Sequence, residues 1–240
     1  MTTLVVGANG ATGRLLVREL LQRGESVRAV VRESAALPEG LANHAGLSVI
    51  RATLLEWSDD ELAELVEGCD AVASCLGHNL SVKGMWGQPR RLVTEATRRL
   101  CRALSRSTSE RRAKLVLMNT TGNRNRDLDE RISFAQACVV ALIRRLVPPH
   151  ADNEEAAEYL RSEIGQAHER IEWAVVRPDG LVDEDEVSAY ETHPSPTRSA
   201  IFDAGKTSRI NVAHFMASLV TDEELWRRWR GQMPVLYNQR

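Results

Sequence analysis

Three glycines, each three residues after the last, limit most strongly what this chain can fold into: Gly7-Ala8-Asn9-Gly10-Ala11-Thr12-Gly13. The apolar residues 3–6 before them predict a strand, and the apolar periodicity of residues 13–23 predicts an amphipathic helix. Between a strand and a helix, such glycines allow a tight turn, close approach of the main chain to a ligand, and close packing of the helix on the strand. N–H groups at the helix N-terminus then bind phosphate. We therefore interpret the segment as a dinucleotide-binding loop rather than a purely structural turn.

The rest of the chain alternates short β-branched runs with longer amphipathic stretches, which is typical of a parallel sheet covered by helices on both faces. Strands are predicted at residues 3–6, 26–31, 47–50, 71–74, 114–118 and 172–176. Helices are predicted at residues 13–23, 59–67 with Asp59 as N-cap, 90–106, 133–146, 153–164, 210–220 and 225–230. The polar residues 119–132 are expected to form a surface loop near the carboxyl edge of the sheet.

These elements predict a single α/β domain over residues 1–240. The expected architecture is a doubly wound, parallel-sheet NAD(P)-binding Rossmann fold. Residues 1–178 would form its cofactor-binding core, and residues 179–240 a small C-terminal substrate-side segment with the last helices.

Composition argues against several other classes of protein. The chain has 43% hydrophobic residues, 27% charged residues and a net charge of −2, so it has no general attraction to nucleic acid or to a membrane surface. No apolar run approaches the roughly 20 residues of a membrane span. The apolar start leads directly into the glycine loop rather than into a leader cleavage site. The four cysteines lack C-x-x-C spacing, so we expect reduced thiols, no metal site and a cytoplasmic protein.

The residue that ends the second predicted strand bears on the choice of cofactor. NAD-specific enzymes place a carboxylate there to bind the ribose hydroxyls, whereas this chain has Arg32. A guanidinium pairs with the 2′-phosphate of NADP, which a carboxylate would repel. Glu33 follows and could reach the ribose instead, which is the argument for NAD. We therefore predict NADP(H) as the cofactor, with NAD as the alternative.

Four further motifs accompany the glycine string. They are Cys75-Leu76-Gly77, Asn119-Thr120-Thr121-Gly122, Val176-Arg177-Pro178-Asp179-Gly180-Leu181 and Ser208-Arg209-Ile210-Asn211-Val212-Ala213. With these motifs the chain resembles the atypical short-chain dehydrogenase/reductase superfamily, over most of its length. It is most similar to the NAD(P)H-binding group that includes flavin reductases, biliverdin-IXβ reductases and nitrogen-regulator redox sensors.

The resemblance implies a set of cofactor contacts. It implies that Leu76 and Gly77 pass the ribose, that Thr120 or Thr121 lies beside the nicotinamide, and that the Arg177-Pro178 segment lines its far side. The family's Gly-Asp after the third strand appears here as Ala52-Thr53, so adenine contacts would fall to Thr53 and Leu54. Beyond the glycine string, the predicted cofactor contacts are Arg32, Thr53, Leu54, Cys75, Leu76, Gly77, Asn119 and Pro178.

The usual proton-transfer pair of the superfamily is missing. Typical members use Tyr-x-x-x-Lys, whose lysine lowers the pKa of the tyrosine, but here Tyr159 is followed four residues later by Glu163. Aligning the family's glutamate with Glu158 puts His150 in the tyrosine position and Glu154 in the lysine position. His150 could then exchange a proton near neutral pH with Glu154 orienting it, or it could simply belong to a helix entry after two prolines.

His78 is a second candidate for catalysis because it follows Gly77 at the carboxyl end of the fourth predicted strand. The alternative is a loop histidine bonded to the backbone. Residues 78–87 mix polar groups, glycines and a tryptophan, which suits a substrate-facing loop or a partner surface. Thr120 and Thr121 stand where the family has a substrate-orienting serine, and either holds a carbonyl oxygen or caps the fifth strand.

Two functional hypotheses follow. The first is an NADP(H)-dependent oxidoreductase acting on a small conjugated, quinone-like or flavin-like molecule, because such an acceptor can take its proton from water. The second is a non-catalytic NADP(H)-binding redox sensor that acts through a protein partner, which the missing Tyr-x-x-x-Lys pair motivates. An epimerase or dehydratase is a more distant third. The sequence does not identify the substrate or the oligomeric state.

Overall fold

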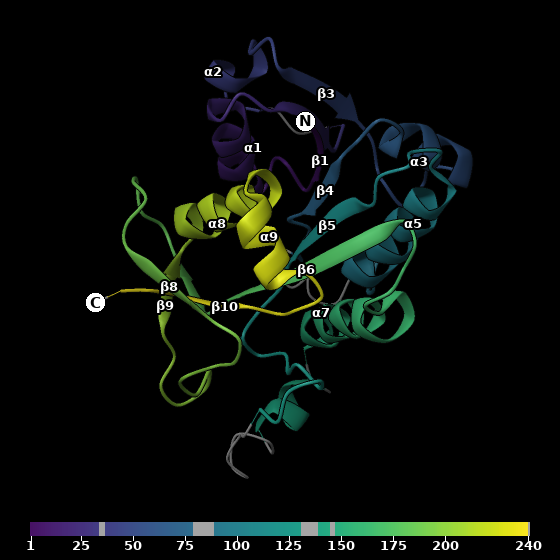
Figure 1. Ribbon diagram of the computed structural model, residues 1–240. Coiled ribbons are helices and arrows are strands. Elements are labelled where there is room, and N and C mark those ends of the chain that lie inside the picture. Colours follow the sequence, from purple (N-terminus) through teal and green to yellow (C-terminus); the bar gives the residue numbers. More distant parts are fainter. Residues whose placement is uncertain (34–36, 79–88, 131–138, 145–146, 240) are drawn as a thin grey trace.

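The computed structural model describes residues 1–33, 37–78, 89–130, 139–144 and 147–239, which build a central eight-stranded sheet (Figure 1). In spatial order its strands are β3 (Leu47–Arg51), β2 (Ser26–Val31), β1 (Thr2–Val6), β4 (Ala71–Ser74), β5 (Ala113–Met118), β6 (Ile171–Pro178), β10 (Val235–Asn238) and β8 (Tyr190–His193). All neighbours from β3 to β10 are parallel, and β8 pairs antiparallel with β10. The predicted doubly wound order of the first six strands is confirmed.

Helices cover both faces of the sheet, which explains why its strands are almost continuously apolar. Leu4 and Val6 of β1 pack into one core and Val5 into the other, and all three are at most 1% exposed. The Val5 face is covered by α1 (Gly13–Gln22), α8 (Arg209–Thr221) and α9 (Glu223–Trp229). The opposite face is covered by α3 (Asp59–Val66), α5 (Leu92–Arg106) and α7 (Pro148–Tyr159). A short further α-helix, α2 (Glu39–Ala42), precedes β3. None of the helices in the described ranges has the length and apolar content that crossing a membrane requires.

The start of α3 differs by one residue from the prediction. Ser58, not Asp59, is the N-cap: its hydroxyl accepts a hydrogen bond from the Glu61 N–H at 3.2 Å. The Glu61 carboxylate in turn accepts from the Ser58 N–H at 2.7 Å, which completes a capping box. The prediction missed this reciprocal pair, and Asp59 is the first helical residue, where a carboxylate still favours the helix dipole.

The helix predicted at residues 153–164 begins five residues earlier. Pro148 opens α7, because proline suits the first helical positions, where no intrahelical donor is needed. The helix continues into one π-helical turn, η1 (Leu160–Ile164), and stops at Gly165 with φ 65°. Of the helix predicted at residues 133–146, residues 139–144 are helical, and the rest lies outside the described residues.

The chain after residue 178 contains more strands than the sequence pattern indicated. Besides β8 and β10, β7 (Gly180–Val182) and β9 (Lys206–Ser208) form a separate parallel pair. The sequence analysis missed all four because three or four residues are too few to display an alternating pattern. α8 then returns to pack against α1. The chain after residue 178 therefore supplies part of the helical layer as well as an extension of the sheet beyond β6.

The loop after β5 was predicted to lie on the surface, and this prediction is wrong for several of its side chains. Asn123, Asn125 and Glu130 are at most 5% exposed. The fully buried Arg177 of β6 donates to the Glu130 carboxylate at 2.7 Å and to the Asn123 carbonyl at 2.8 Å. This internal cation anchors the loop to the end of β6, so the polar composition reflects buried hydrogen bonding rather than exposure.

Candidate cofactor and substrate site

The glycine loop joins β1 to α1 and lies against the end of β4. Gly7 has φ +74°, and a Cβ on it would be 2.7 Å from the Cys75 carbonyl oxygen. A Cβ on Gly13 would be 2.1 Å from the Gly7 carbonyl oxygen. The Gly10 N–H closes the turn on that same oxygen at 2.9 Å. The backbone is thus too close-packed for side chains at the loop's two ends, which leaves a main-chain cradle at the N-terminus of α1 that suits a pyrophosphate.

A cavity of about 780 Å³ opens over this loop at the carboxyl edge of the sheet. Its volume lies inside the range of roughly 300–1,000 Å³ that is usual for ligand sites. The ends of β1, β2, β3 and β4 supply its walls. Eleven residues singled out from the sequence line it: Gly7, Asn9, Gly10, Ala11, Arg32, Thr53, Leu54, Cys75, Leu76, Gly77 and His78. The arrangement is a crevice at the point where the strand order reverses, which fits a dinucleotide.

Arg32 lies exposed on the rim of this cavity, at the end of β2. Among the described residues its guanidinium forms no hydrogen bond or ion pair, whereas the neighbouring Arg51 donates to the Glu33 carbonyl at 3.2 Å. Thr53 and Leu54 follow β3 on the same side of the cavity. This end of the cavity therefore offers a cation without an internal partner, beside the apolar Leu54.

Four of the predicted cofactor residues lie outside the cavity lining. Thr12 is buried and Gly13 packs under the loop on the Gly7 carbonyl. The Asn119 amide donates to the Asn153 carbonyl at 2.9 Å, which links the end of β5 to α7. Pro178 is buried, and its carbonyl accepts from the Thr121 N–H at 3.1 Å. None of these four residues has a place in the cavity lining, and each is buried or hydrogen-bonded to neighbouring backbone.

Beyond the end of β5 the structure brings Thr120 and His150 together. Gly122 lies between them: a Cβ there would be 3.0 Å from His150 Cε1 and 3.7 Å from Thr120 Oγ1. The Thr120 hydroxyl accepts from the Gly122 N–H at 3.2 Å. Within the described part of the chain, the buried Nε2 of His150 has no hydrogen-bond partner. This pair lies after β5, the neighbour of β4, and neither residue is part of the lining of the cofactor cavity.

Thr121, the other threonine of this motif, has a structural role. Its hydroxyl donates to Asp179 Oδ1 at 3.1 Å, and both residues are buried. The other Asp179 oxygen accepts from the Gly205 N–H at 2.8 Å, so this carboxylate ties the β5 loop to the segment before β9. The expectation that either threonine can hold a substrate carbonyl is therefore corrected: the Thr121 hydroxyl is already committed, and Thr120 remains.

The protonation of His150 is controlled by its surroundings. Burial lowers its pKa below 6.5, Glu154 opposes this, and Arg144 adds to it. Glu154 is itself paired with Arg126 at 3.3 Å and with Arg144 at 3.1 Å. Among the described residues no hydrogen bond joins Glu154 to the His150 ring, so the orienting role expected of Glu154 stays a prediction. The lowered pKa leaves the imidazole of His150 neutral at pH 7.

This environment predicts a pH dependence of stability. Because the folded pKa of His150 is below its value in the unfolded chain, the stabilisation is complete above pH 6.5 and is lost as the pH falls through the folded pKa. We expect the free energy of unfolding of the wild type, measured with urea, to fall between pH 7.5 and pH 5.5. In His150→Gln the fall should be smaller. Burial also lowers the pKa of His214, and this contribution to the pH dependence is the same in both proteins. An equal fall in the free energy of unfolding in the two proteins would therefore contradict the prediction.

His78 is paired with a residue that the sequence analysis did not single out. Its Nε2 lies 2.7 Å from Oδ2 of Asp152, which belongs to α7. Among the described residues the ring bonds to this side chain rather than to the backbone, and the catalytic role predicted for His78 stays a prediction. Asp152 belongs to no recognisable motif and lies 74 residues after His78. Its pairing with His78 therefore becomes visible only once α7 is packed on α5. The rest of the loop predicted to face substrate, residues 79–87, lies outside the described residues.

The cysteine beside the cofactor cavity is unsuited to thiolate chemistry. Burial raises the pKa of Cys75 to about 12, and the same cause raises the pKa of Cys101 to about 12. Both thiols are therefore protonated at neutral pH. Cys75 contributes its backbone and bulk to the cavity wall.

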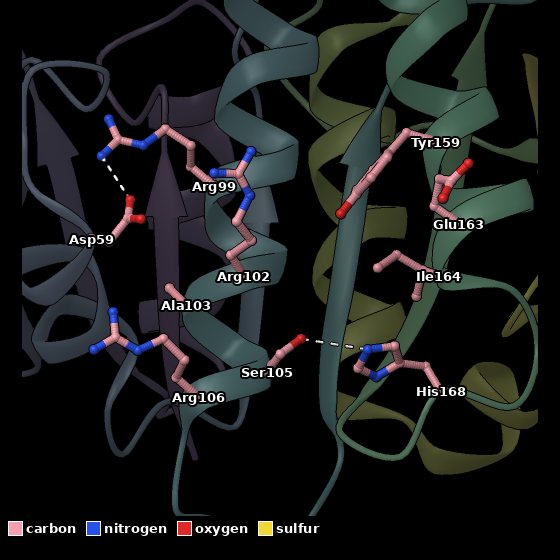
Figure 2. A pocket seen from close by; sticks show the side chains of 10 residues that line it. All are labelled: Asp59, Arg99, Arg102, Ala103, Ser105, Arg106, Tyr159, Glu163, Ile164 and His168. Atoms are coloured by element: carbon pink, nitrogen blue, oxygen red, sulfur yellow. Dashed lines mark hydrogen bonds and ion pairs between the residues drawn. The ribbon is translucent and has the colours of Figure 1, made fainter.

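A second cavity, of about 440 Å³, lies between α5 and the end of α7 (Figure 2). Its basic residues come from the C-terminal half of α5, and two of them already have partners: Arg99 pairs with Asp59 at 3.2 Å and Arg106 with Asp60 at 2.6 Å. His168 faces Ser105 across it at 3.4 Å. Since α5 begins at the cofactor cavity and runs away from it, this hollow is separate from the glycine loop.

Comparison with known proteins agrees with this geometry. Anaerobilin reductase ChuY from Escherichia coli O157:H7 superposes with a TM-score of 0.67 at 17% identity, over 99% of this chain and 97% of that one. A wide-type short-chain dehydrogenase/reductase from Veillonella parvula, solved with NADP, gives a TM-score of 0.66 at 14% identity, over 99% and 94%. The oxidoreductase ylbE from Lactococcus lactis gives 0.69 at 15% identity, over 100% and 92%. At these identities the likeness establishes the fold.

Similarity in sequence gives a finer assignment. Chloroplastic divinyl chlorophyllide a 8-vinyl-reductase from Arabidopsis thaliana is 34% identical over 95 residues, which are 36% of this chain and only 23% of that protein. A family model described as NAD(P)H-binding matches residues 7–223. That match takes in the glycine loop, the β2, β3 and β4 walls of the cofactor cavity, and α8, while β1 lies just before the matched range. This protein belongs to the NAD(P)H-binding family.

Proposed function

We propose that this protein is an NADP(H)-dependent reductase that acts on a small conjugated, quinone-like or flavin-like acceptor. One observation carries the proposal: a cavity with the glycine loop as its floor has on its rim Arg32, whose guanidinium has no partner among the described residues. Two similar proteins, a vinyl reductase and an anaerobilin reductase, give further support to reduction of a conjugated acceptor.

The residues of the chain have separate tasks in this proposal. The main chain from Gly7 to Gly13 holds the pyrophosphate, and Arg32 pairs with the 2′-phosphate. NADPH, when bound, supplies the hydride. The Thr120 hydroxyl orients the acceptor at the β5 side, beside the neutral imidazole of His150. Because burial lowers the pKa of His150, the acceptor's proton comes from water rather than from an imidazolium at this position.

The role of Arg32 can be tested by its replacement with alanine. We expect Arg32→Ala to weaken NADPH binding about tenfold to a hundredfold, which corresponds to the loss of a charged hydrogen bond, and to leave NADH binding unchanged. Titration of intrinsic or nicotinamide fluorescence would measure both dissociation constants. Arg111→Ala, which removes an exposed arginine just before β5, is the matched control. Equal losses for NADPH and NADH would remove Arg32 as the basis of selectivity.

Reductase activity is tested by following NADPH absorbance with a panel of quinones, flavins and enones. Oxidation of NADPH that depends on one class of acceptor, and that falls in Thr120→Val, is the expected result.

A sensor is the second candidate, because Glu154 stands in the lysine position and is bound by two arginines. Tight NADPH binding without turnover of any acceptor in the panel would favour the sensor over the reductase.

A further inference from the structure

The buried pair of His78 and Asp152 lies at the cofactor cavity and has no part in the proposal above. The His78 side chain is 5% exposed and the Asp152 side chain 1% exposed, at 2.7 Å from each other. His78 nevertheless lines the cavity, next to Gly77 and Leu92. Removing a carboxylate from water costs free energy unless hydrogen bonds to its oxygens compensate for the lost hydration.

Asp152 is held so that its position is fixed from three sides. Its two oxygens accept hydrogen bonds from the Val93 N–H at 2.8 Å and the Thr94 N–H at 2.9 Å, in the first turn of α5. Its backbone carbonyl accepts from the Thr94 hydroxyl at 2.9 Å. Although burial raises the pKa of Asp152, the hydrogen bonds from His78, Thr94 and Val93 lower it overall. Asp152 is thus an ionised acceptor at the junction of α5, α7 and His78.

The ionised carboxylate determines which nitrogen of His78 carries the proton. A carboxylate can only accept, so the Nε2 that faces it must carry a hydrogen. In the neutral ring Nδ1 is then an acceptor. Among the described residues Nδ1 forms no hydrogen bond. Asp152 therefore sets the tautomer of a ring whose other nitrogen has no partner in the described part of the chain.

The strand order indicates which part of the ligand lies there. The glycine loop at the end of β1 takes the pyrophosphate, and Arg32 at the end of β2 takes the adenosine side. The nicotinamide half must then extend to the other side of β1, over β4 and β5. His78 follows β4, so the group nearest to it along the cofactor is the ribose between the pyrophosphate and the nicotinamide.

We infer that His78 accepts a hydrogen bond from a hydroxyl of the nicotinamide-side ribose through Nδ1, and that Asp152 is the positioning residue that fixes this tautomer. The inference rests on the proposed binding of NADP(H). It gives His78 and Asp152, which lie far apart in the sequence, one shared function in cofactor binding. It also explains why a carboxylate that caps α5 is placed against the cavity wall.

Two ligands separate this inference from the proposed cofactor site as a whole. NADPH carries both riboses, whereas adenosine 2′,5′-bisphosphate carries only the adenosine side. In His78→Ala we expect about fivefold to tenfold weaker binding of NADPH by calorimetry, as for one lost hydrogen bond, and unchanged binding of adenosine 2′,5′-bisphosphate. His168→Ala, a histidine in the second cavity, is the control and should change neither.

Asp152 is tested by its replacement with alanine, which removes the acceptor that fixes the tautomer of His78. In Asp152→Ala the Nε2–H of His78 has no acceptor, so the ring is no longer held with Nδ1 as its acceptor, and NADPH binding should weaken toward the level of His78→Ala. The double variant should bind NADPH no more weakly than His78→Ala, because Asp152 acts through His78. The constant affinity for adenosine 2′,5′-bisphosphate reports that each variant is folded.

Three results would overturn the inference. Unchanged NADPH binding in His78→Ala would remove the ribose contact and leave the proposed function standing. An equal loss for both ligands would mean that the histidine acts on the fold rather than on the ribose. A further loss in the double variant would mean that Asp152 acts independently of His78. A wild type that binds neither ligand would instead overturn the proposed cofactor site itself.

Discussion

Replacing Gly13 by alanine is expected to weaken NADPH binding about a hundredfold and to destabilise the protein. The new Cβ would be 2.1 Å from the Gly7 carbonyl oxygen, 2.9 Å from the Gly7 carbonyl carbon and 3.0 Å from Ala8 Cα. All three atoms belong to the backbone, so no flexible side chain can move aside. The loop must open, which costs about 1–3 kcal/mol as overpacking does elsewhere. Loss of two or three main-chain hydrogen bonds to the pyrophosphate accounts for the loss of affinity.

The control for this prediction is Gly40→Ala in α2. A Cβ on Gly40 meets no atom within 4 Å, so the substitution adds the same methyl group to a helix without a clash. We expect Gly40→Ala to match the wild type in NADPH affinity and in the midpoint of urea unfolding. If Gly13→Ala still binds NADPH like the wild type, the loop is not the cradle of the pyrophosphate.

The part of the fold that sequence could predict is the part with long, buried, regular elements. Most of the six parallel strands are apolar on both faces because two helical layers cover them, and this makes them visible as continuous apolar runs, whereas the edge strand β3 is partly exposed. The four strands after β6 were missed for the opposite reason. β7 and β9 have three residues each and β8 and β10 have four each, so their pairing is decided by distant partners.

The site divides in the same way. The glycine loop and Arg32 are readable because each acts through its own local backbone or charge, and the structure puts both on one cavity. Asp152 could not be predicted, because its meaning depends on the packing of α7 against α5. The two alternatives for Thr121 could not be separated from sequence for a related reason: Asp179, which accepts from its hydroxyl, lies 58 residues later. A local pattern predicts the set of roles that a residue can have, and its tertiary partners determine which of those roles it takes.

The buried ion pair of Arg177 and Glu130 supports the second large prediction. Arg177 is fully buried and donates to both Glu130 oxygens, at 2.7 Å and 3.1 Å. It also donates to the carbonyls of Asn123, Pro194 and Met233, at 2.8, 3.1 and 2.7 Å. One cation therefore joins the β5 loop, the segment after β8 and the approach to β10. The motif reading that this segment lines the nicotinamide is corrected for Arg177, whose donors all point into the protein.

In Glu130→Gln we expect the free energy of unfolding to fall by about 3–5 kcal/mol, because the substitution leaves the Arg177 cation buried without its counter-charge. Urea unfolding measures this, with Asp60→Asn as the control. Asp60 pairs with Arg106 at the surface, where its side chain is 82% exposed, so its loss should cost less than about 1 kcal/mol. Replacing both partners, as Arg177→Met with Glu130→Leu, should recover much of the loss, because no buried charge then remains. A loss below about 1 kcal/mol in Glu130→Gln would mean that water or another group neutralises Arg177, and the loop that carries Thr120 would then owe its position to something other than this pair.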